Sequence, residues 1–455
     1  MQSILPQKLR ALAQNLPAPL YGVGGFVRDF LGNLHAANPD IDICGPMLAE
    51  EFASYAIGAG LTPQAVYKHT GTVKLTDNEG HDFEYTCFRH DKYVRGEHTP
   101  AEIYFTEDIS LDSRRRDFTV NAIYYEIAAG RFVDPLGGIP AIGEKRLTTV
   151  DRAQKVFGED GLRLMRLARF AGQLGFAPDE NCLQGAIENA ALIEDISPER
   201  IFAELTQILR ADEKYGVIDG HYQGLLTLER IGVLAKIMPE LTLGKGIAQR
   251  PDFHRYDMLF HSLQTVKYAH PSIRLAALLH DVGKPFCHLR DGNSHEHPNE
   301  GARIAVDILG RLKAPKKTIE QVQELTLLHM YDFNCQTKES KLRRFFVDHY
   351  SYLDELLLIK QADYSGCMDD TNIAPTVKRW TELRNVMQEE GAPFTLKDLQ
   401  IKGSDLLQRV PAPLISLVLK ELLYHAVCNP KDNYKERLLA ILPTALHAAK
   451  QKRKE

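Results

Sequence analysis

The sequence lacks the features that would direct it into or across a membrane. It contains no apolar run that approaches the length of about 20 residues needed to cross a bilayer. The first residues, MQSILPQKLRALAQNL, carry charge and Gln where a signal peptide requires an apolar stretch. These absences predict a cytoplasmic protein that has no membrane partner.

Cysteine is scarce and dispersed. The seven cysteines include no CxxC pair, and an odd, scattered set in a long chain argues against both a disulfide framework and a zinc ribbon. We therefore expect reduced thiols, as in the cytoplasm. Low-complexity segments and clear internal repeats are also missing, so the pattern is that of an ordinary globular chain.

The chain also lacks an excess of positive charge. Its formal net charge is −5 at pH 7, whereas a protein that binds nucleic acid purely by electrostatics would be basic overall. The position of the charge matters more than its sum. The basic residues gather in three places, which are residues 114–116, the set Arg163, Arg166 and Arg169, and the C-terminal KQKRKE.

The hydrophobic pattern changes once along the 455 residues, which are enough for roughly three or four domains. Before residue 150, short β-branched and aromatic runs predict strands at IDIC, TVKL, FEYTCF, AEIYF, AIYYEI and RFVDP. Helices are expected at 5–16, 26–32 and 47–58. After residue 151, apolar residues at helical spacing dominate, as in GLRLMRLARFAGQLGF.

Gly and Pro gather near 245–255 and 371–398, which predicts domain boundaries there. The sequence therefore predicts an α+β protein with four parts. These are a mixed-sheet head at 1–150, a helical body at 151–245, a histidine-rich helical domain at 250–370 and a helical C-terminal region at 371–455.

The first motif, Tyr21-Gly-Val-Gly-Gly-Phe-Val-Arg-Asp29, begins as a strand and ends as a helix. Gly24 and Gly25 carry no side chain, so the backbone there can approach a ligand closely. The following helix N-terminus suits a phosphate, and Arg28 adds positive charge. A tight strand-to-helix connection would by itself explain the two glycines, so the motif gains meaning from its neighbours.

Two carboxylates follow on the next predicted strand. Asp40 and Asp42 are two residues apart, so both point to one side and repel each other unless a cation lies between them. Mg²⁺ prefers hard oxygen ligands and bridges to phosphates, and two such ions can activate a hydroxyl and stabilise leaving pyrophosphate. Glu84, on a neighbouring strand, is the candidate third carboxylate. An exposed strand face would explain Asp-x-Asp alone, but the preceding Gly-Gly-x-x-Arg favours the catalytic metal site.

A third group lies on a helix that is predicted to start at Glu159 and to carry Asp160, Arg163, Arg166 and Arg169 at three-residue steps. A carboxylate accepts hydrogen bonds and a guanidinium donates them. An Asp beside an Arg therefore matches the pairing edges of cytosine and adenine and rejects those of guanine and uracil. The alternative is a surface ion pair between Asp160 and Arg163, which would contribute little to stability.

The region 251–370 is rich in histidine. Six of its residues lie at the end or on the face of predicted helices, namely His261, His280, Asp281, His297, His329 and Asp363. A lone His on an apolar helix is more often a core residue than a ligand, but six such residues are much harder to explain in that way. Imidazole together with carboxylate suits a transition metal better than Mg²⁺.

These motifs resemble those of one family in their order. GGFVRD, DID, RRDFTVNA at 115–122 and GEDGLRLMRLARFA at 158–171 are similar to the motifs of the class II tRNA nucleotidyltransferase and poly(A) polymerase family. The histidine-rich region resembles the HD phosphohydrolase superfamily. Gly161 stands where the family commonly has Pro, and Ser113 replaces a usual Leu. Neither departure removes a chemical group, so they affect loop geometry rather than the expected activity.

The resemblance implies a nucleotidyltransferase head with a mixed sheet, an all-α neck and body, a helical HD domain and a helical C-terminal segment. It implies nucleotide binding by Gly24, Gly25, Arg28, Arg115, Arg116, Asp117, Asn121, Asp160, Arg163, Arg166 and Arg169. Asp160 and Arg163 would read the incoming base. In the HD domain the residues that match metal ligands are His261, His280, Asp281 and Asp363, while His297 and His329 match positions that bind a second metal or phosphate.

The implied function is template-independent addition of the 3′-terminal CCA to tRNA from CTP and ATP, with Mg²⁺ as cofactor. Residues 90–114 resemble the family's flexible loop at full length, which disfavours an enzyme that adds only CC. An A-adding or CC-adding specialist and a poly(A) polymerase stay open. Two alternatives of other classes are an HD phosphohydrolase whose head binds RNA and a nucleotide sensor without chemistry. The activity of the HD site and the oligomeric state also stay open.

Overall fold

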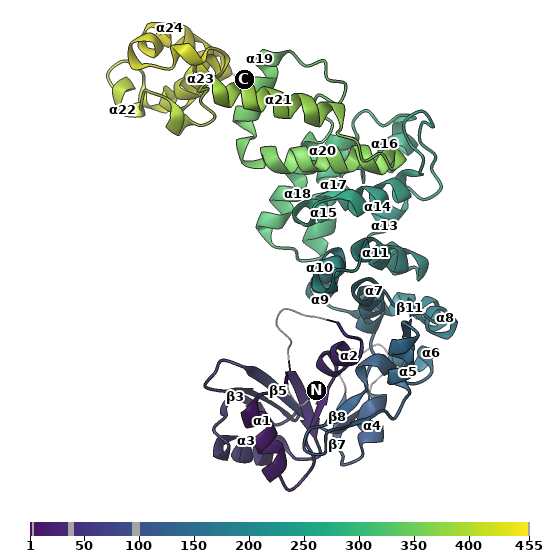
Figure 1. The fold of residues 1–455 in the computed structure, drawn as a ribbon. Coiled ribbons are helices and arrows are strands. Elements are labelled where there is room, and N and C mark those ends of the chain that lie inside the picture. Colours follow the sequence, from purple (N-terminus) through teal and green to yellow (C-terminus); the bar gives the residue numbers. More distant parts are fainter. Residues whose placement is uncertain (2–3, 35–40, 93–100, 454–455) are drawn as a thin grey trace. The chain divides into compact units, whose positions relative to one another are not determined.

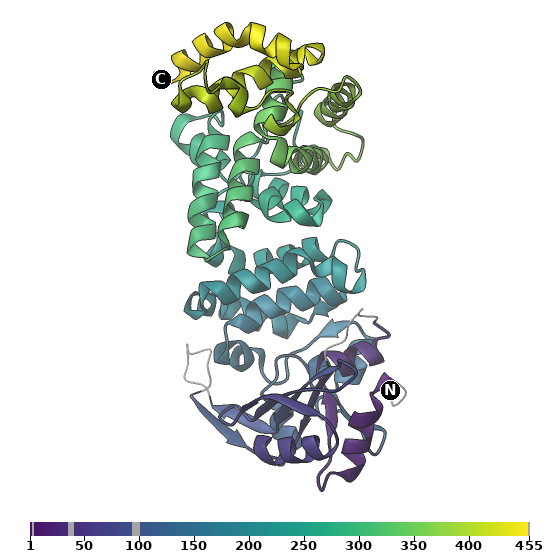
Figure 2. The same cartoon turned by 90° about the vertical axis from the view of Figure 1, so that its left-hand side faces the viewer.

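The computed structural model describes residues 1, 4–34, 41–92 and 101–453, and Figures 1 and 2 show its ribbon from two sides. The chain forms two compact units. The first comprises Met1–Leu243 with Gly310–Ala314, and the second comprises Gly244–Leu309 with Pro315–Glu455. Within the described ranges, no helix is both long and apolar enough to span a bilayer.

The first unit is built on a sheet of seven described strands in the order β3-β4-β5-β2-β1-β8-β9. β2 and β5 run parallel, and all other neighbouring strands are antiparallel, so the sheet is mixed. Two short pairs, β6 with β7 and β10 with β11, lie outside it. The strands are β1 Tyr21–Val23, β2 Ile41–Gly45, β3 Thr62–Tyr67, β4 Thr72–Thr76, β5 Asp82–Cys87, β6 Arg89–Lys92, β7 Glu102–Phe105, β8 Tyr124–Glu126, β9 Arg131–Val133, β10 Arg146–Leu147 and β11 Ala177–Pro178.

Alternation of side chains fixes the faces of the central strands. In β5, Phe83, Tyr85 and Cys87 are buried while Glu84 is exposed, as expected for a period of two. The Tyr85 ring stacks on Phe52 of helix α3 (Ala49–Gly58) with ring centroids 3.7 Å apart. This packing buries one face of the sheet and leaves Glu84 on the other face.

The helices of the first unit are α1 Gln7–Asn15, α2 Gly25–Leu31, α3 Ala49–Gly58, α4 Ile109–Arg114, α5 Gly138–Gly143, α6 Ala153–Glu159, α7 Leu162–Leu174, α8 Glu180–Glu188, α9 Pro198–Leu209, α10 Ala211–Tyr215, α11 Gly220–Arg230, α12 Val233–Ile237 and α13 Pro239–Thr242. From α6 onward this part is almost entirely helical (Figure 1). α7 and α11 pack so closely that a Cβ at Gly172 would lie 2.3 Å from the carbonyl oxygen of Gly220, which only glycine at residue 172 avoids.

The second unit is helical throughout its described residues (Figure 2). Its helices are α14 Met258–Tyr268, α15 Arg274–Leu279, α16 Lys284–Asp291, α17 His297–Arg311, α18 Lys316–Leu328, α19 Glu339–Asp348, α20 Leu353–Met368, α21 Pro375–Glu389, α22 Gly403–Leu406, α23 Ile415–Cys428 and α24 Lys435–Lys452. α22, α23 and α24 share an apolar core that includes Leu406, Leu422 and Leu438. The predicted α+β class, with a mixed-sheet head and helical remainder, is confirmed.

Two local predictions differ from the structure. The strand β3 (Thr62–Tyr67) is absent from the predicted set, because it is a largely exposed edge strand without buried alternation. The helix expected to start at Glu159 starts instead at Leu162 as α7, and Glu159 is the last residue of α6. Asp160 lies between α6 and α7 with extended backbone, and it accepts a hydrogen bond at 2.9 Å from the amide of Leu162, the first residue of α7.

Candidate functional site

The first unit contains a cleft of about 570 Å³ next to the Gly-Gly turn. Eight cationic side chains and four carboxylates line it, so positive charge is concentrated there in a chain whose net charge is −5. The cleft brings together Asp42 and the eleven residues predicted to bind nucleotide, namely Gly24, Gly25, Arg28, Arg115, Arg116, Asp117, Asn121, Asp160, Arg163, Arg166 and Arg169. These residues come from segments up to 145 positions apart along the sequence, from Gly24 to Arg169.

The Gly-Gly turn lies between β1 and α2 and has a conformation that favours glycine. Gly24 has φ of 72°, and a Cβ at this position would lie 3.2 Å from Oδ2 of Asp42. The turn therefore allows the backbone to pass close to the carboxylate of β2. A side chain at residue 24 would enter the space beside Asp42.

The predicted carboxylate set is described in part. Asp40 lies outside the described residues. Asp42 and Glu84 are register partners on the parallel strands β2 and β5, so their side chains share one face of the sheet. Glu84 does not line the cleft, and its Oε2 lies 3.9 Å from Nζ of Lys74. Asp42 and Glu84 offer the hard oxygen donors that Mg²⁺ accepts.

A chain of hydrogen bonds joins the cleft residues of the head to those of the neck. Arg166 of α7 donates to Oδ2 of Asp117 through Nε at 2.8 Å and Nη2 at 2.5 Å. Asn121 donates to the other oxygen of Asp117 at 3.0 Å and accepts from Arg28 at 2.7 Å. Burial raises the pKa of Asp117, but the Arg166 charge and these hydrogen bonds outweigh it and hold the pKa well below its ordinary range. Asp117 is therefore ionised at neutral pH.

Tyr215, from α10, extends this network and was not predicted. Its hydroxyl accepts from Arg28 at 2.9 Å and donates to Asp29 at 2.7 Å. Arg28 also donates to Asp29 through Nε at 2.9 Å and Nη2 at 2.6 Å. No local sequence signal marks Tyr215, because it lies 187 positions from Arg28.

Asp112 is a second residue that the sequence analysis missed. Its carboxylate is fully buried and accepts from Arg115 at 2.7 Å, Arg116 at 3.1 Å and the Tyr124 hydroxyl at 2.7 Å. Burial raises its pKa, but the charges of Arg116 and Arg115 outweigh burial and lower the pKa to about 2. The spacing of Asp112 from these arginines, three and four positions along a helix end, is a signal that could have found it.

The segment that is predicted to read the base is held firmly. Arg163 is 5% exposed, so a surface ion pair does not describe it. Its guanidinium donates to Glu159 Oε2 at 3.0 Å, to the Val156 carbonyl at 2.9 Å and to the Arg115 carbonyl at 2.7 Å. Asp160 and Arg163 both line the cleft.

The predicted histidine cluster also comes together, within the second unit. Its members come from five helices or their ends: His261 from α14, His280 and Asp281 after α15, His297 at the start of α17, His329 after α18 and Asp363 from α20. The Asp281 carboxylate is the centre of the cluster. Its oxygens lie 3.2 Å from Nε2 of His261, His280 and His297 and 3.5 Å from Nε2 of His329. Asp363 Oδ1 lies 3.1 Å from His261 Nε2 and 3.5 Å from His280 Nε2.

Three of these imidazoles are oriented by backbone carbonyls. Nδ1 of His280, His297 and His329 lies 2.8, 2.6 and 2.7 Å from the carbonyl oxygens of Ala277, Ser294 and Thr326. Because a carbonyl only accepts, each Nδ1 carries a proton, and each Nε2 faces the cluster, where it is able to bind a metal when it is unprotonated. This is the usual outer hydrogen bond of a histidine that binds a metal.

The electrostatics of the cluster fit a cation. Both oxygens of Asp281 are buried and accept no well-formed hydrogen bond from any described residue, although Lys284 Nζ lies 2.5 Å from Oδ2. Burial lowers the pKa of His280, but the Asp281 and Asp363 carboxylates outweigh it and raise the pKa to about 10, so positive charge is stabilised here. Burial lowers the pKa of His329 to about 4, which leaves that imidazole neutral. Carboxylates and imidazoles together suit a divalent transition metal.

The head combines a mixed sheet, a Gly-Gly turn, the Asp42 carboxylate on the open face of the sheet and a cationic cleft. Together these features define a nucleotidyltransferase head, and the histidine cluster on five helices defines an HD domain. Family models match both modules. The "Poly A polymerase head domain" matches residues 20–148, the "Probable RNA and SrmB-binding site of polymerase A" matches 175–243, and the HD domain matches 259–364. Both modules are of types that use divalent metal ions.

Relatives agree with these matches. The chain is 30% identical over 359 residues to an A-adding tRNA nucleotidyltransferase of Deinococcus radiodurans, and the match covers 75% of each chain. It is 40% identical over 191 residues to a CCA-adding enzyme of Geobacillus sp. (strain WCH70), but this match covers 42% of the chain and 45% of that enzyme. The chain thus spans less than half the length of this second relative. It belongs to the family of class II tRNA nucleotidyltransferases and poly(A) polymerases and carries an HD domain.

Solved structures share the fold. The crystal structure of the Bacillus stearothermophilus CCA-adding enzyme in complex with CTP aligns over 98% of both chains with 24% identity and a TM-score of 0.66. The Thermotoga maritima CCA-adding enzyme complexed with tRNA aligns over 97% of this chain and 96% of that one, with 17% identity and a TM-score of 0.62. At this identity the likeness concerns the fold alone.

Proposed function

We propose that this chain adds the 3′-terminal CCA to tRNA from CTP and ATP and releases pyrophosphate. The observation that carries the proposal is the cationic cleft, where Asp42 lies beside Gly24 and the predicted nucleotide-binding residues gather. A triphosphate needs concentrated positive charge, and the reaction mainly needs position and charge from the protein. The CCA-adding enzymes among the relatives support this product.

Asp42, with Asp40 and Glu84, would hold Mg²⁺ at the open face of the sheet. When bound, Mg²⁺ lowers the pKa of the RNA 3′-hydroxyl and offsets the charge of the leaving pyrophosphate. The protein's own part is to hold the carboxylates and the triphosphate in line. Arg28, with the helix N-terminus of α2, would bind phosphate oxygens.

Asp160 and Arg163 would select the base. The pairing edge of cytosine or adenine offers an amino donor beside a ring nitrogen acceptor, which an Asp and an Arg complement. Glu159 and the carbonyls of Val156 and Arg115 would fix the Arg163 guanidinium, so that one orientation of its remaining donors is presented to the base. A guanidinium held in one orientation discriminates between bases better than a mobile one, because the edge of a wrong base leaves its buried polar groups unpaired.

The second unit would carry a metal-dependent phosphohydrolase activity. The convergence of His261, His280, Asp281 and Asp363 supports this, with His297 and His329 on the far side of Asp281. The substrate class would be phosphomonoesters or 2′,3′-cyclic phosphates at an RNA end. This site would act separately from nucleotide addition.

An A-adding specialist is the second candidate for the head. A relative of that activity is 30% identical to this chain over 75% of its length. Both candidates share the head motifs, and they differ in whether CTP is used. The described part of residues 90–114, which forms β6, β7 and α4, does not decide between them, and 93–100 lie outside the described residues.

Extension of end-labelled tRNA tests the proposal. Transcripts that end before CCA, after C and after CC are incubated with Mg²⁺ and each nucleotide alone or with CTP and ATP together. Growth of all three to CCA, followed by a stop, is expected. A single A added to the CC transcript alone would make the protein an A-adding specialist, and long A tails would make it a poly(A) polymerase. Absence of any addition would overturn the proposal and favour the HD hydrolase.

A further inference from the structure

The loop before α14 brings a further histidine to the edge of the HD cluster. His254 is partly buried, and its ring centroid lies 4.9 Å from that of His261. Cys367, near the end of α20, completes a group with these two histidines. One potential ligand atom from each of the three residues lies within 4.8 Å of the others. Neither His254 nor Cys367 belongs to the cluster that the sequence predicts.

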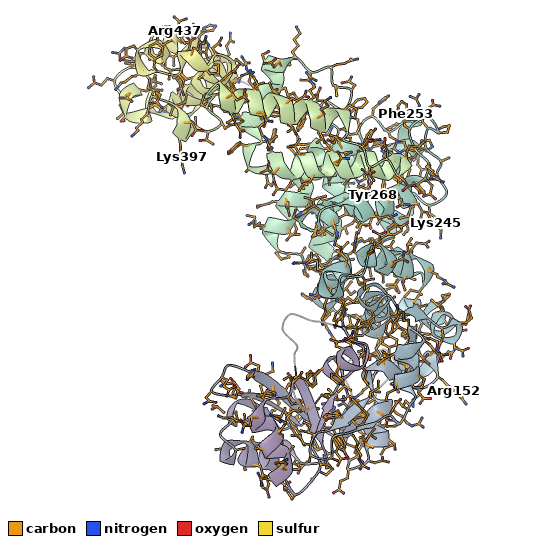
Figure 3. All side chains as sticks on the ribbon, in the orientation of Figure 1. Arg152, Lys245, Phe253, Tyr268, Lys397 and Arg437 are labelled. Atoms are coloured by element: carbon orange, nitrogen blue, oxygen red, sulfur yellow. The ribbon has the colours of Figure 1, made fainter. Side chains whose placement is uncertain are left out.

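Backbone and side-chain contacts hold this loop against α20. The amide of Arg255, the residue after His254, donates to the Cys367 carbonyl at 2.9 Å. Asp369 accepts from the hydroxyls of Tyr256 at 2.5 Å and Tyr268 at 2.9 Å. Figure 3 labels Tyr268 and also Phe253, the residue before His254. The approach of His254 to Cys367 is thus built into the fold rather than left to a free loop.

The helix that carries Cys367 is also pressed against the helix that carries His261. A Cβ at Gly366 would lie 2.6 Å from Oγ1 and 2.8 Å from the amide nitrogen of Thr265. Any side chain at residue 366 would force α20 and α14 apart. The close approach places Cys367 beside His261, and its Sγ lies 3.9 Å from Oδ1 of Asp363.

Two ring nitrogens in this group have no hydrogen-bond partner among the described residues. They are Nδ1 of His254 and Nδ1 of His261, and both atoms are buried. His261 as a whole is 0% exposed. A buried imidazole nitrogen that lacks a partner loses its interaction with water for no return, unless a ligand takes that place.

We propose that His254, His261 and Cys367 form a metal site next to Asp281 in the HD domain, and that this site binds a divalent ion that accepts a thiolate, such as Zn²⁺ or Co²⁺. Imidazole and thiolate are the donors these ions prefer, whereas Mg²⁺ and Ca²⁺ prefer oxygen. Asp363 and His261 would be shared between this site and the predicted HD ligands, because Nε2 of His261 faces Asp281 and Asp363 and its Nδ1 has no hydrogen-bond partner among the described residues. When the ion binds, the Cys367 proton passes to solvent, because the thiolate is the metal ligand. If His261 holds an ion on each ring nitrogen, its ring proton passes to solvent as well.

This inference rests on the proposed HD metal centre, and the experiment separates the two. The full-length protein is treated with a chelator and titrated with Co²⁺, and the near-ultraviolet and visible spectra are recorded. A sulfur-to-cobalt charge-transfer band in the near ultraviolet reports the Cys367 bond, while the visible bands report any bound cobalt. Competition by Zn²⁺ then gives the zinc affinity.

Cys367→Ser and His254→Gln are compared with Cys428→Ser, a cysteine on α23 whose thiol faces the Ser340 carbonyl. The charge-transfer band is expected in the wild type and in Cys428→Ser, and its loss is expected in Cys367→Ser. Both site variants should bind Zn²⁺ at least about tenfold more weakly, as loss of a ligand costs no less than loss of an outer partner. Circular dichroism before titration identifies any variant that has not folded, and His254→Gln leaves the thiol in place.

Each outcome decides one of the two ideas. Cobalt binding that shows visible bands but no charge-transfer band in the wild type would overturn the thiolate site and leave the HD centre intact. The same band in Cys367→Ser would also overturn it. Absence of any cobalt or zinc binding in the wild type would overturn the HD metal centre itself.

Discussion

Arg166 of α7 donates two hydrogen bonds to Oδ2 of Asp117 in the head, from Nε at 2.8 Å and from Nη2 at 2.5 Å. Through Asn121, Asp117 is joined to Arg28 of α2, the helix that follows the Gly-Gly turn. Residues that the sequence analysis assigns to separate motifs therefore form one network. A change at one end should be felt at the other, since coupled hydrogen bonds are not additive.

Arg166→Lys tests this coupling. Lysine keeps the charge but cannot make both hydrogen bonds, because its donors are not arranged as a planar fork. We expect nucleotide addition, measured as kcat/KM in the tRNA extension assay, to fall at least about tenfold, which corresponds to about 1.4 kcal/mol. The control is Arg210→Lys, at an exposed pair with Glu213. If the two variants lower kcat/KM equally, the paired hydrogen bonds from Arg166 to Asp117 do not contribute to nucleotide addition.

Gly161 precedes the helix that carries Arg163, and it is packed against another backbone. A Cβ there would lie 2.4 Å from the Leu192 carbonyl oxygen, so Gly161→Ala should lower the free energy of unfolding by about 1–3 kcal/mol. The backbone displacement that makes room for the methyl group should also move Asp160 and so raise misincorporation of GTP and UTP. Gly158→Ala is the matched control, because the nearest atom to its Cβ would be Asn189 Oδ1 at 3.7 Å. Denaturant unfolding and extension with each nucleotide measure both effects, and an unchanged Gly161→Ala protein would contradict them.

This glycine also shows where sequence reasoning ended. The family resemblance marks Gly161 as a departure, but the Leu192 carbonyl that excludes a side chain lies 31 positions away. Local patterns predicted the mixed-sheet head, the helical remainder and the histidine cluster, because hydrophobic periodicity and short motifs depend on residues that are close together in the sequence. Tyr215 and the pairing of His254 with Cys367 depend on contacts between distant segments, so no local pattern announced them. Asp160 was predicted to lie on the helix because it continues the three-residue spacing of Arg163, Arg166 and Arg169, although α7 begins only at Leu162.

Asp112 predicts a pH dependence. Its pKa is lowered from 3.8 to about 2 in the folded protein, so the unfolded chain binds more protons in this range and stability falls as the pH falls. The contribution is fully present well above pH 3.8 and is lost as the pH drops through about 2. It amounts to about 2 kcal/mol, at about 1.4 kcal/mol for each unit of pKa.

The measurement is the free energy of unfolding of the wild type and of Asp112→Asn across this range. At neutral pH the variant should be less stable by about 3–5 kcal/mol, because the partly buried Arg115 and Arg116 lose the buried carboxylate that is their partner. The gap should narrow by about 2 kcal/mol toward the acid end. Asp354→Asn, whose side chain is 84% exposed, should show no such narrowing. A gap that is constant with pH would contradict the role given to Asp112.

Lys360 is expected to position His329 in the HD cluster. Its buried ammonium donates to the carbonyls of His329 at 2.7 Å and Tyr331 at 2.6 Å, so Lys360→Met leaves two carbonyls without that donor. Zinc affinity of the HD domain should fall about 10- to 100-fold, as for other residues that orient metal ligands, while tRNA extension stays unchanged. Lys317→Met, at an exposed position of α18, is the control. Equal metal affinity in the two variants would rule out positioning by Lys360.

The two proposed activities should separate by mutation. Asp42 and Asp281 belong to different compact units, and each is replaced by Asn, which keeps the shape but removes the charge. Asp42→Asn should lower nucleotide addition by at least about 100-fold, since the loss of a metal-binding carboxylate removes several kcal/mol of stabilisation. In Asp42→Asn, the binding of tRNA by the protein and the binding of zinc by the HD domain should both persist. Asp281→Asn should weaken zinc binding at the predicted HD ligands and abolish any phosphatase activity, while the thiolate site at Cys367 still binds zinc and extension of tRNA to CCA is unchanged. Joint loss of tRNA binding and addition in a folded Asp42→Asn protein would mean that Asp42 has a structural role, and failed addition in folded Asp281→Asn would mean that the two sites depend on each other.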